Sequence, residues 1–194
     1  MYRPRIFISH CEKKMAPTEY AMRIISLLGC EPVIAERQAK GSKSVNGVVN
    51  MGMNSCDAVI VIATADLKNG KKYSPSSGVS LELGKLKNSR KFKSKYFIVK
   101  QDNVDLSAMN EEARYTFSDS NYGPIAEAIL IELGSMELYT NSVSLHTGDR
   151  EISKFIETLF SLRKAGENGH LNNPSFKLAV QEFTQKLVDL IIQK

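Results

Sequence analysis

The stretch DAVIVIATA, residues 57–65, is the most strand-like part of this chain. Between Asp57 and Thr64 all of its residues are apolar, with no alternation between hydrophobic and polar positions. A strand with one face in water alternates, whereas a strand of a parallel sheet with helices over both faces reads as a continuous apolar run. We therefore expect 57–65 to be the central strand of a parallel sheet.

Further strand and helix patterns alternate on both sides of this run. Short β-branched and aromatic runs predict four more strands, at 5–9, 31–35, 95–100 and 114–117. Apolar residues at helical spacing predict helices at 17–28, at 45–53, around Glu82 after a long loop at 66–77, and at 122–136. Strands that alternate with helices in this way predict an α/β fold, with right-handed crossovers and helices on both faces of the sheet.

The last part of the chain has a different pattern. Residues 137–150 are polar and rich in turn formers, so we expect them to be a connection. Apolar positions then recur at helical spacing at 152–160 and 176–191, which predicts a C-terminal helical hairpin. The expected division is an α/β domain at 1–138 and a hairpin extension at 150–194. The apolar faces of the hairpin would pack on the sheet domain or on a second copy of the chain.

Composition is typical of an ordinary globular protein, with 42% hydrophobic and 24% charged residues. No apolar run approaches the roughly 18 residues of a membrane helix, and the start of the chain lacks the apolar core of a signal peptide. We therefore expect a cytoplasmic protein without a membrane partner.

The three cysteines and three histidines have no metal-ligand spacing, so free thiols and no metal are expected. The net charge of +5 permits phosphate-bearing ligands, but the lysines of 85–95 have few aromatic residues between them, which argues against a nucleic-acid partner.

Candidate ligand contacts lie at one edge of the predicted sheet. In sheets of this kind, ligands bind beyond the carboxyl ends of the strands, where the strand order reverses. The loops at that edge are 9–16, 36–44 and 64–78, and Glu82 lies one helical turn beyond the third loop. The residues there that suit a nucleotide are Ser9, His10, Arg37, Lys40, Gly41, Lys43, Ser76, Ser77 and Ser80.

These candidates differ in their chemistry. The basic side chains and bare backbone of 37–43 suit a pyrophosphate. One of the serines before the Glu82 helix is expected to cap it, and free amides at a helix start favour an anion. Each candidate also has an ordinary structural explanation. The basic loop can be a solvated turn or a partner contact, His10 a strand-end residue, and Glu82 a surface carboxylate stabilised by the helix dipole.

Four stretches in order resemble the TIR domain, most closely its prokaryotic nucleotide-binding branch. They are RIFISH at 5–10, GCEPVIAERQAKGSKSV at 29–45, CDAVIVIAT at 56–64 and SSGVSLELGKL at 76–86, and the likeness spans about 4–136. The resemblance implies a flavodoxin-like, doubly wound parallel sheet of five strands, to which the hairpin would be an addition. Many TIR domains cleave the bond between nicotinamide and ribose in NAD with a glutamate in the helix after the third strand. SLELG places Glu82 at that position.

The resemblance also implies a setting for this chemistry. Many stand-alone prokaryotic TIR proteins, including those of Thoeris-type systems, act in anti-phage defence. There they deplete NAD or convert it to a cyclic or otherwise modified ADP-ribose messenger. NAD would be the substrate, and no other cofactor is implied.

A carboxylate suits this reaction because nicotinamide is a cationic leaving group in NAD and needs no general acid to depart. The barrier lies in the positive charge that develops on the ribose, which a carboxylate near the sugar can stabilise.

Two alternatives stay open. Other TIR domains bind nucleotides or associate with one another without catalysis, through the TIR domain or through added helices. A nucleoside deoxyribosyltransferase also uses a glutamate at a sugar carbon. The product, the trigger and the oligomeric state do not follow from these residues.

Overall fold

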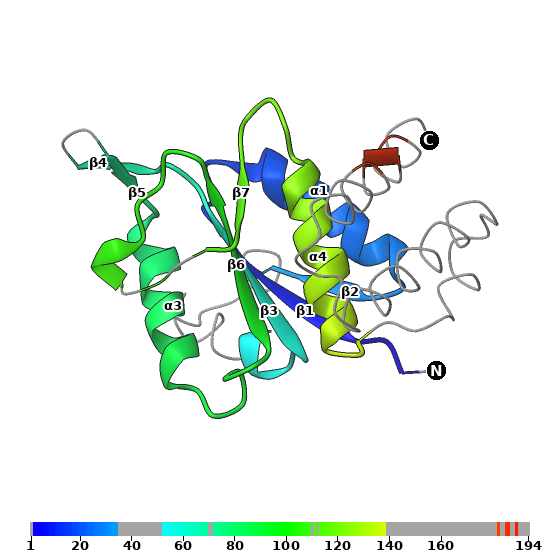
Figure 1. The fold of residues 1–194 in the computed structure, drawn as a ribbon. Coiled ribbons are helices and arrows are strands. Elements are labelled where there is room, and N and C mark those ends of the chain that lie inside the picture. Colours follow the sequence, from blue (N-terminus) through cyan, green and yellow to red (C-terminus); the bar gives the residue numbers. More distant parts are fainter. Residues whose placement is uncertain are drawn as a thin grey trace, which may run out of the picture.

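A computed structural model describes residues 2–34, 52–69, 72–109, 111, 113–138, 182, 185, 186 and 189 (Figure 1). The strands are β1 (Arg5–Ser9), β2 (Glu31–Val33), β3 (Ala58–Ala63), β4 (Leu67–Asn69), β5 (Lys72–Ser74), β6 (Tyr96–Gln101) and β7 (Tyr115–Phe117). The helices are α1 (Met15–Leu27), α3 (Ser77–Asn88) and α4 (Gly123–Ser135), with a 3₁₀ turn η2 (Ser107–Met109).

Five of these strands form one parallel sheet, in the order β2-β1-β3-β6-β7. The central strand β3 pairs with β1 on one side and β6 on the other, so that Ile60 lies between Ile8 and Phe97. This order is that of the flavodoxin-like doubly wound sheet, and it reverses between β1 and β3. The predicted α/β fold, its parallel five-stranded sheet and the central place of 57–65 are therefore confirmed.

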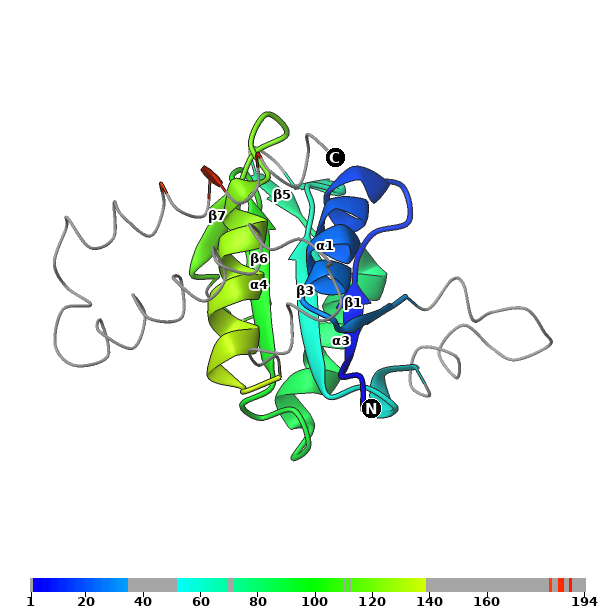
Figure 2. The same cartoon turned by 90° about the vertical axis from the view of Figure 1, so that its right-hand side faces the viewer.

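Helices cover both faces of the sheet (Figure 2). On the face of α1 and α4, Ile60 packs in one buried cluster with Ile25 and Ile129. On the face of α3, Phe7 and Leu83 belong to a second buried cluster. All six residues of β3 are buried, because the strand has a helical layer on each side.

Two helices end in the same hydrogen-bond pattern. The N–H groups of Gly29 and Cys30 donate back to carbonyls of the last turn of α1, at 3.0 and 3.1 Å. The N–H groups of Glu137 and Leu138 do the same at the end of α4, both at 3.1 Å. This cap requires a left-handed residue, and φ is 76° at Gly29 and 55° at Glu137. Glycine adopts that conformation without steric cost, whereas glutamate does not.

The two caps predict that glycine is the more stable residue at both left-handed positions. Glu137→Gly is expected to raise the free energy of unfolding by about 1 kcal/mol, because it removes the steric cost of a left-handed residue. Gly29→Ala is expected to lower it by about 1 kcal/mol for the converse reason. Urea unfolding followed by circular dichroism measures both. A loss of stability in Glu137→Gly would contradict this account of the cap.

One stretch differs from its prediction. The sequence predicts a loop over 66–77, but β4 and β5 pair there as an antiparallel hairpin, so that part of the prediction is wrong. The strands have three residues each and carry Lys68 and Lys72, which leaves too little apolar alternation to reveal them. The hairpin is held by the loop after β6. The N–H of Asp105 donates to the Tyr73 carbonyl at 2.8 Å, and Lys72 contacts the Asp105 carboxylate at 2.9 Å, which lowers the pKa of that carboxyl.

Two predicted elements lie almost entirely outside the described residues. They are the helix at 45–53, of which only its last part is described as helical, and the hairpin at 150–194, of which only four positions are described. The boundary between the domains at 1–138 and 150–194 stays a prediction. Within the described ranges, no helix is long and apolar enough to cross a membrane.

The three cysteines are free and buried. Burial raises the pKa of the Cys30 and Cys56 thiols to about 11, so both are protonated at neutral pH. A protonated, buried thiol is a poor nucleophile, so these two cysteines are ordinary core residues. Among the residues that the structure describes, no group of histidine, cysteine and carboxylate side chains could hold a metal ion.

Candidate active site

The carboxyl ends of the parallel strands lie at the edge of the sheet opposite the N-terminus (Figure 2). Several residues at these strand ends are polar. Ser9 ends β1, Thr64 follows β3 and Gln101 ends β6. All three are buried, although they are polar. The strand order reverses between β1 and β3, so Ser9 and Thr64 flank the point at which sheets of this kind bind ligands.

Ser9 has a buried hydroxyl that makes no hydrogen bond to the described residues. The residue is 1% exposed, and no described group forms a hydrogen bond with its Oγ. Side chains alternate along a strand, so Ser9 points to the same side of the sheet as Phe7, the side that α3 covers. A buried hydroxyl without a hydrogen bond costs free energy, and a ligand that supplied the missing bond would recover it.

The helix α3 carries Glu82 on that same side of the sheet. Val79, Leu83 and Leu86 are the buried residues of α3. Glu82 comes three residues after Val79 and four before Leu86, so helical spacing places it on the flank of this buried stripe. Its side chain is partly buried. Glu82 lies five residues after the first residue of α3, about 8 Å along the helix axis.

The serines before Glu82 organise the start of α3. Ser76 is the N-cap residue, and its hydroxyl accepts a hydrogen bond from the Val79 N–H at 3.4 Å. The Ser80 hydroxyl donates to the Ser76 carbonyl at 3.0 Å. Ser77, the first helical residue, is exposed. The expectation that a serine caps this helix is therefore confirmed, while ligand contacts of the three serines stay predictions.

Asp66 occupies the space in front of α3. Its carboxylate accepts hydrogen bonds from the Thr64 hydroxyl, at 2.9 and 3.0 Å, and from the Ser76 N–H at 3.1 Å. Burial raises the pKa of the nearby Cys11 thiol, and the Asp66 carboxylate adds to the rise. The sequence shows Asp66 only as an acid after the β3 strand. Because its carboxylate already accepts from Ser76, that amide is not open to an anion, and a pyrophosphate would need other donors.

Gln101 connects the loops of this edge. Its amide oxygen accepts from the Ala65 N–H at 3.0 Å and from the Lys14 ammonium at 3.4 Å. Its amide nitrogen donates to the Asp119 carboxylate at 3.0 Å. One buried side chain thus joins the segments that follow β1, β3 and β7. The sequence gives no signal for this role, because Gln101 ends a strand and belongs to no motif.

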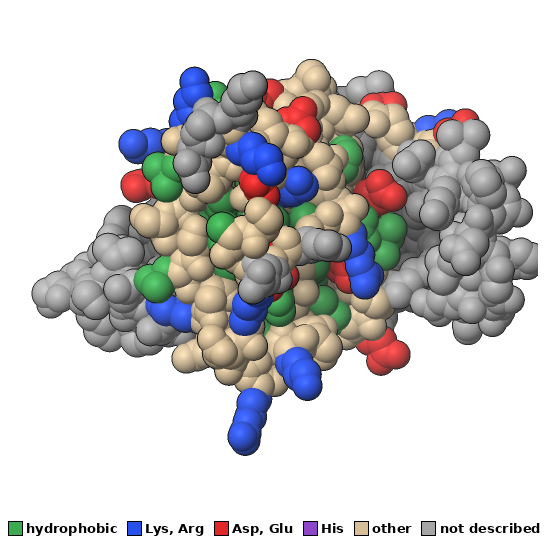
Figure 3. Space-filling model, turned by 60° about the vertical axis from the view of Figure 1, so that its left-hand side comes forward, with side chains coloured by type: hydrophobic (Ala, Val, Ile, Leu, Met, Phe, Trp, Pro, Cys, Tyr) green, Lys and Arg blue, Asp and Glu red, His purple; other side chains and the backbone are tan. Residues whose placement is uncertain are grey.

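The remaining predicted contacts are placed only in part. His10 follows β1 and is partly buried, with its Nδ1 3.2 Å from the Ile8 carbonyl oxygen. Arg37, Lys40, Gly41 and Lys43 lie outside the described residues. On the face that carries α3, lysines and arginines are scattered among other side chains (Figure 3).

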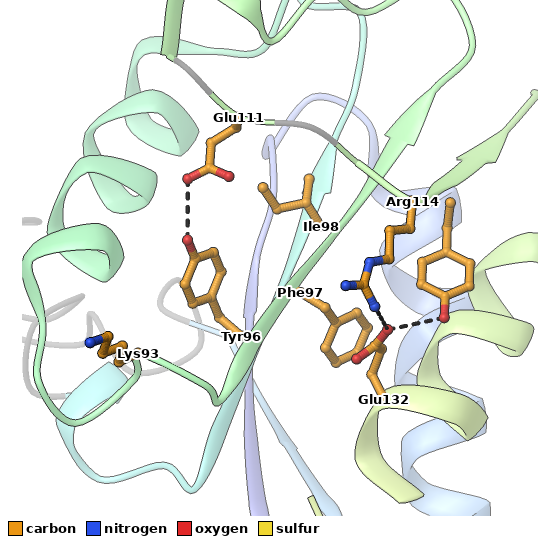
Figure 4. Close-up of a pocket in the computed structure, with 8 residues that line it drawn as sticks. Lys93, Tyr96, Phe97, Ile98, Glu111, Arg114 and Glu132 are labelled. Carbon is orange, nitrogen blue, oxygen red and sulfur yellow. Dashed lines mark hydrogen bonds and ion pairs between the residues drawn. The ribbon is translucent and has the colours of Figure 1, made fainter. Parts of the chain in front are cut away.

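A separate cavity of about 260 Å³ lies at the opposite end of β6 (Figure 4). On its α3 side the Tyr96 hydroxyl donates to Glu111 at 3.2 Å, and on its α4 side the Tyr115 hydroxyl donates to Glu132 at 3.0 Å. Arg114 lies over the same space, 3.9 Å from Glu132. Tyr96, Phe97 and Ile98 of β6 line this cavity, whereas Gln101 ends the strand, so the cavity lies about 10–16 Å from the carboxyl edge and is not the candidate active site.

Comparison with protein families agrees with this fold. The family model for the TIR domain of CAP12/Pycsar effector proteins matches residues 5–110. That range runs from β1 to just past η2 and includes Ser9, Asp66 and Glu82. A search of curated proteins finds no match to the chain.

Proposed function

Because the chain belongs to the TIR-domain family of CAP12/Pycsar effector proteins, we propose that it is an anti-phage effector enzyme that cleaves the nicotinamide–ribose bond of NAD. Glu82 is the essential carboxylate in this proposal. It would stabilise the positive charge that develops on the ribose while nicotinamide leaves with the bonding electrons. Capture of the ribose by water would give ADP-ribose, and capture by a hydroxyl would give a cyclic or conjugated product.

The observation that carries the proposal is the shared side of Ser9 and Glu82. Ser9, whose buried hydroxyl makes no hydrogen bond to the described residues, lies at the reversal of strand order, and the partly buried Glu82 lies in the helix that covers the same side of the sheet. A ribose hydroxyl can accept or donate the hydrogen bond that Ser9 lacks. A carboxylate on the flank of a buried stripe is less screened by water than an exposed one, which strengthens its effect on a developing charge.

The remaining ligand contacts follow from charge. The start of α3 already holds the Asp66 carboxylate, so the pyrophosphate of NAD would bind away from Ser76. Arg37, Lys40, Gly41 and Lys43 supply the donors that it needs. Self-association through the TIR domain or the C-terminal region would be the route by which the enzyme is activated.

The proposal is tested by incubating the full chain with NAD, with and without a crowding agent that promotes assembly. Chromatography follows nicotinamide, and mass spectrometry identifies the ribose-containing product. Nicotinamide and an ADP-ribose species should appear in equal amounts. Failure to release nicotinamide under either condition would favour a non-catalytic nucleotide binder. Exchange of free bases between deoxynucleosides, without action on NAD, would favour a deoxyribosyltransferase.

Ser9→Ala should separate stability from binding. In the free protein, the variant removes a buried hydroxyl that makes no hydrogen bond to the described residues, so its free energy of unfolding should rise by about 1 kcal/mol. With NAD, the variant cannot make the new hydrogen bond, so KM should rise about tenfold. Thermal unfolding and initial-rate kinetics measure the two effects. A variant that is less stable and has an unchanged KM would exclude Ser9 from the ligand site.

A further inference from the structure

We propose that Asp66 is a positioning residue, which holds the start of α3 against the β3 end of the sheet and so sets the place of Glu82. The inference rests on the proposed function for its catalytic consequence. Its structural consequence can be measured without any activity. Asp66 does not need to touch the substrate in this role, because it acts through the backbone of the segment that precedes Glu82.

Asp66 binds the far end of the segment 66–76 through both its backbone and its side chain. Its own N–H donates to the Ser74 carbonyl at 3.2 Å, and its carboxylate accepts from the Ser76 N–H at 3.1 Å. The hairpin β4–β5 lies between Asp66 and Ser76 in the chain, so Asp66 joins the segment that leaves β3 to the segment that enters α3. The Thr64 hydroxyl, in a residue that is 2% exposed, donates to both carboxylate oxygens and fixes the rotamer of Asp66.

The position of Ser76 then determines the first turn of α3. Its hydroxyl accepts from the Val79 N–H, and its carbonyl accepts from both the N–H and the hydroxyl of Ser80, each at 3.0 Å. Glu82 follows Ser80 by two residues in the same helix. A shift of Ser76 therefore moves Glu82 with the helix, as a rigid unit.

The backbone on the other side of Asp66 is held as well. The Ala65 N–H donates to the buried Gln101 amide, which is bound in turn to Asp119 beyond β7. Because the backbone before Asp66 is held to the sheet, the hydrogen bond from Ser76 to Asp66 fixes the start of α3 relative to the sheet. Its negative charge also lies at the N-terminus of α3, where it interacts favourably with the helix dipole.

The test compares Asp66→Ala with Asp66→Asn in the full chain. Asparagine keeps an oxygen for the Ser76 N–H and a group for Thr64, so turnover should stay within about threefold of the wild type. Alanine loses both bonds. Its kcat should fall about 10- to 100-fold with little change in KM, because a small misplacement of a reacting group costs this much. If Asp66→Asn loses as much turnover as Asp66→Ala while its amides at 74–84 stay as protected as in the wild type, the charge acts on the substrate directly and the positioning role is excluded.

Hydrogen exchange gives a readout that does not depend on turnover. Exchange of the amides of 74–84 should be faster in Asp66→Ala than in the wild type and in Asp66→Asn, while the amides of α4 should exchange equally in all three. Unchanged exchange at 74–84 would overturn the inference even if NAD is cleaved. If the wild type does not cleave NAD, the proposed function fails, and the exchange result still settles the role of Asp66. If Asp66→Ala does not fold, Thr64→Val removes one donor to the carboxylate and should show the same changes in smaller measure.

Discussion

Glu82→Gln is expected to lower kcat for NAD cleavage by about 10³-fold, with KM changed by less than about threefold. Glutamine has the shape of glutamate and can accept hydrogen bonds, but it carries no charge to stabilise a cationic sugar. An interaction that exists only in the transition state lowers kcat and kcat/KM equally when it is removed. Initial rates of nicotinamide release over a range of NAD concentrations separate the two constants.

Two further variants make this result specific to Glu82. Glu82→Asp keeps the charge but withdraws it by one methylene, so its kcat should lie between those of the wild type and Glu82→Gln. Glu19→Gln removes a carboxylate from the exposed surface of α1 and should leave both constants unchanged. Equal turnover by Glu82→Gln and the wild type would end the assignment of Glu82 as the essential carboxylate.

The largest effect on stability is expected at Phe7. Its side chain is fully buried, and β1 places it between Val33 of β2 and Val59 of β3. Phe7→Ala should lower the free energy of unfolding by about 3–5 kcal/mol, because the lost apolar contacts leave a cavity that the sheet cannot close. Urea unfolding measures the loss. It is carried out at low temperature because a loss of this size is a large part of the total stability of a typical domain, and the variant must still be folded without urea.

A graded control is Phe7→Leu, which keeps most of the side-chain volume and should cost less than half as much. A loss below about 1 kcal/mol in Phe7→Ala would mean that the α3 side of the sheet can repack around the missing ring. The aromatic side chain would then be dispensable for this layer.

The sheet was predictable because its strands are buried on both faces. Continuous apolar runs such as 57–65 leave no other place for their side chains than the interior, so the order of elements and the fold class follow from the sequence. The hairpin at 67–74 was not predictable in the same way. Its short strands are held by backbone bonds to the loop after β6 and by the ion pair of Lys72 with Asp105, and neither contact leaves a periodic pattern.

The candidate site could be located but not assembled from the sequence. The edge of the sheet and the helix with Glu82 follow from the alternation of elements. That Ser9 and Glu82 share one side depends on the alternation of β1 and on the stripe by which α3 packs, and both require the structure. The roles of Asp66 and Gln101 depend on contacts between segments that lie apart in the sequence, so no local sequence pattern could have shown these roles.

The short last strand leaves part of the sheet edge open. β7 begins opposite Val99, so within the described residues 96–98 have a strand neighbour only on the β3 side. Peptide groups on such an edge can join the strands of another molecule, which is a common route to aggregation. Here the charged side chains of Glu111 and Arg114 stand over the edge (Figure 4). A foreign strand would have to displace the water around the Arg114 guanidinium, whose side chain is 85% exposed, before it could pair, and this cost disfavours such pairing.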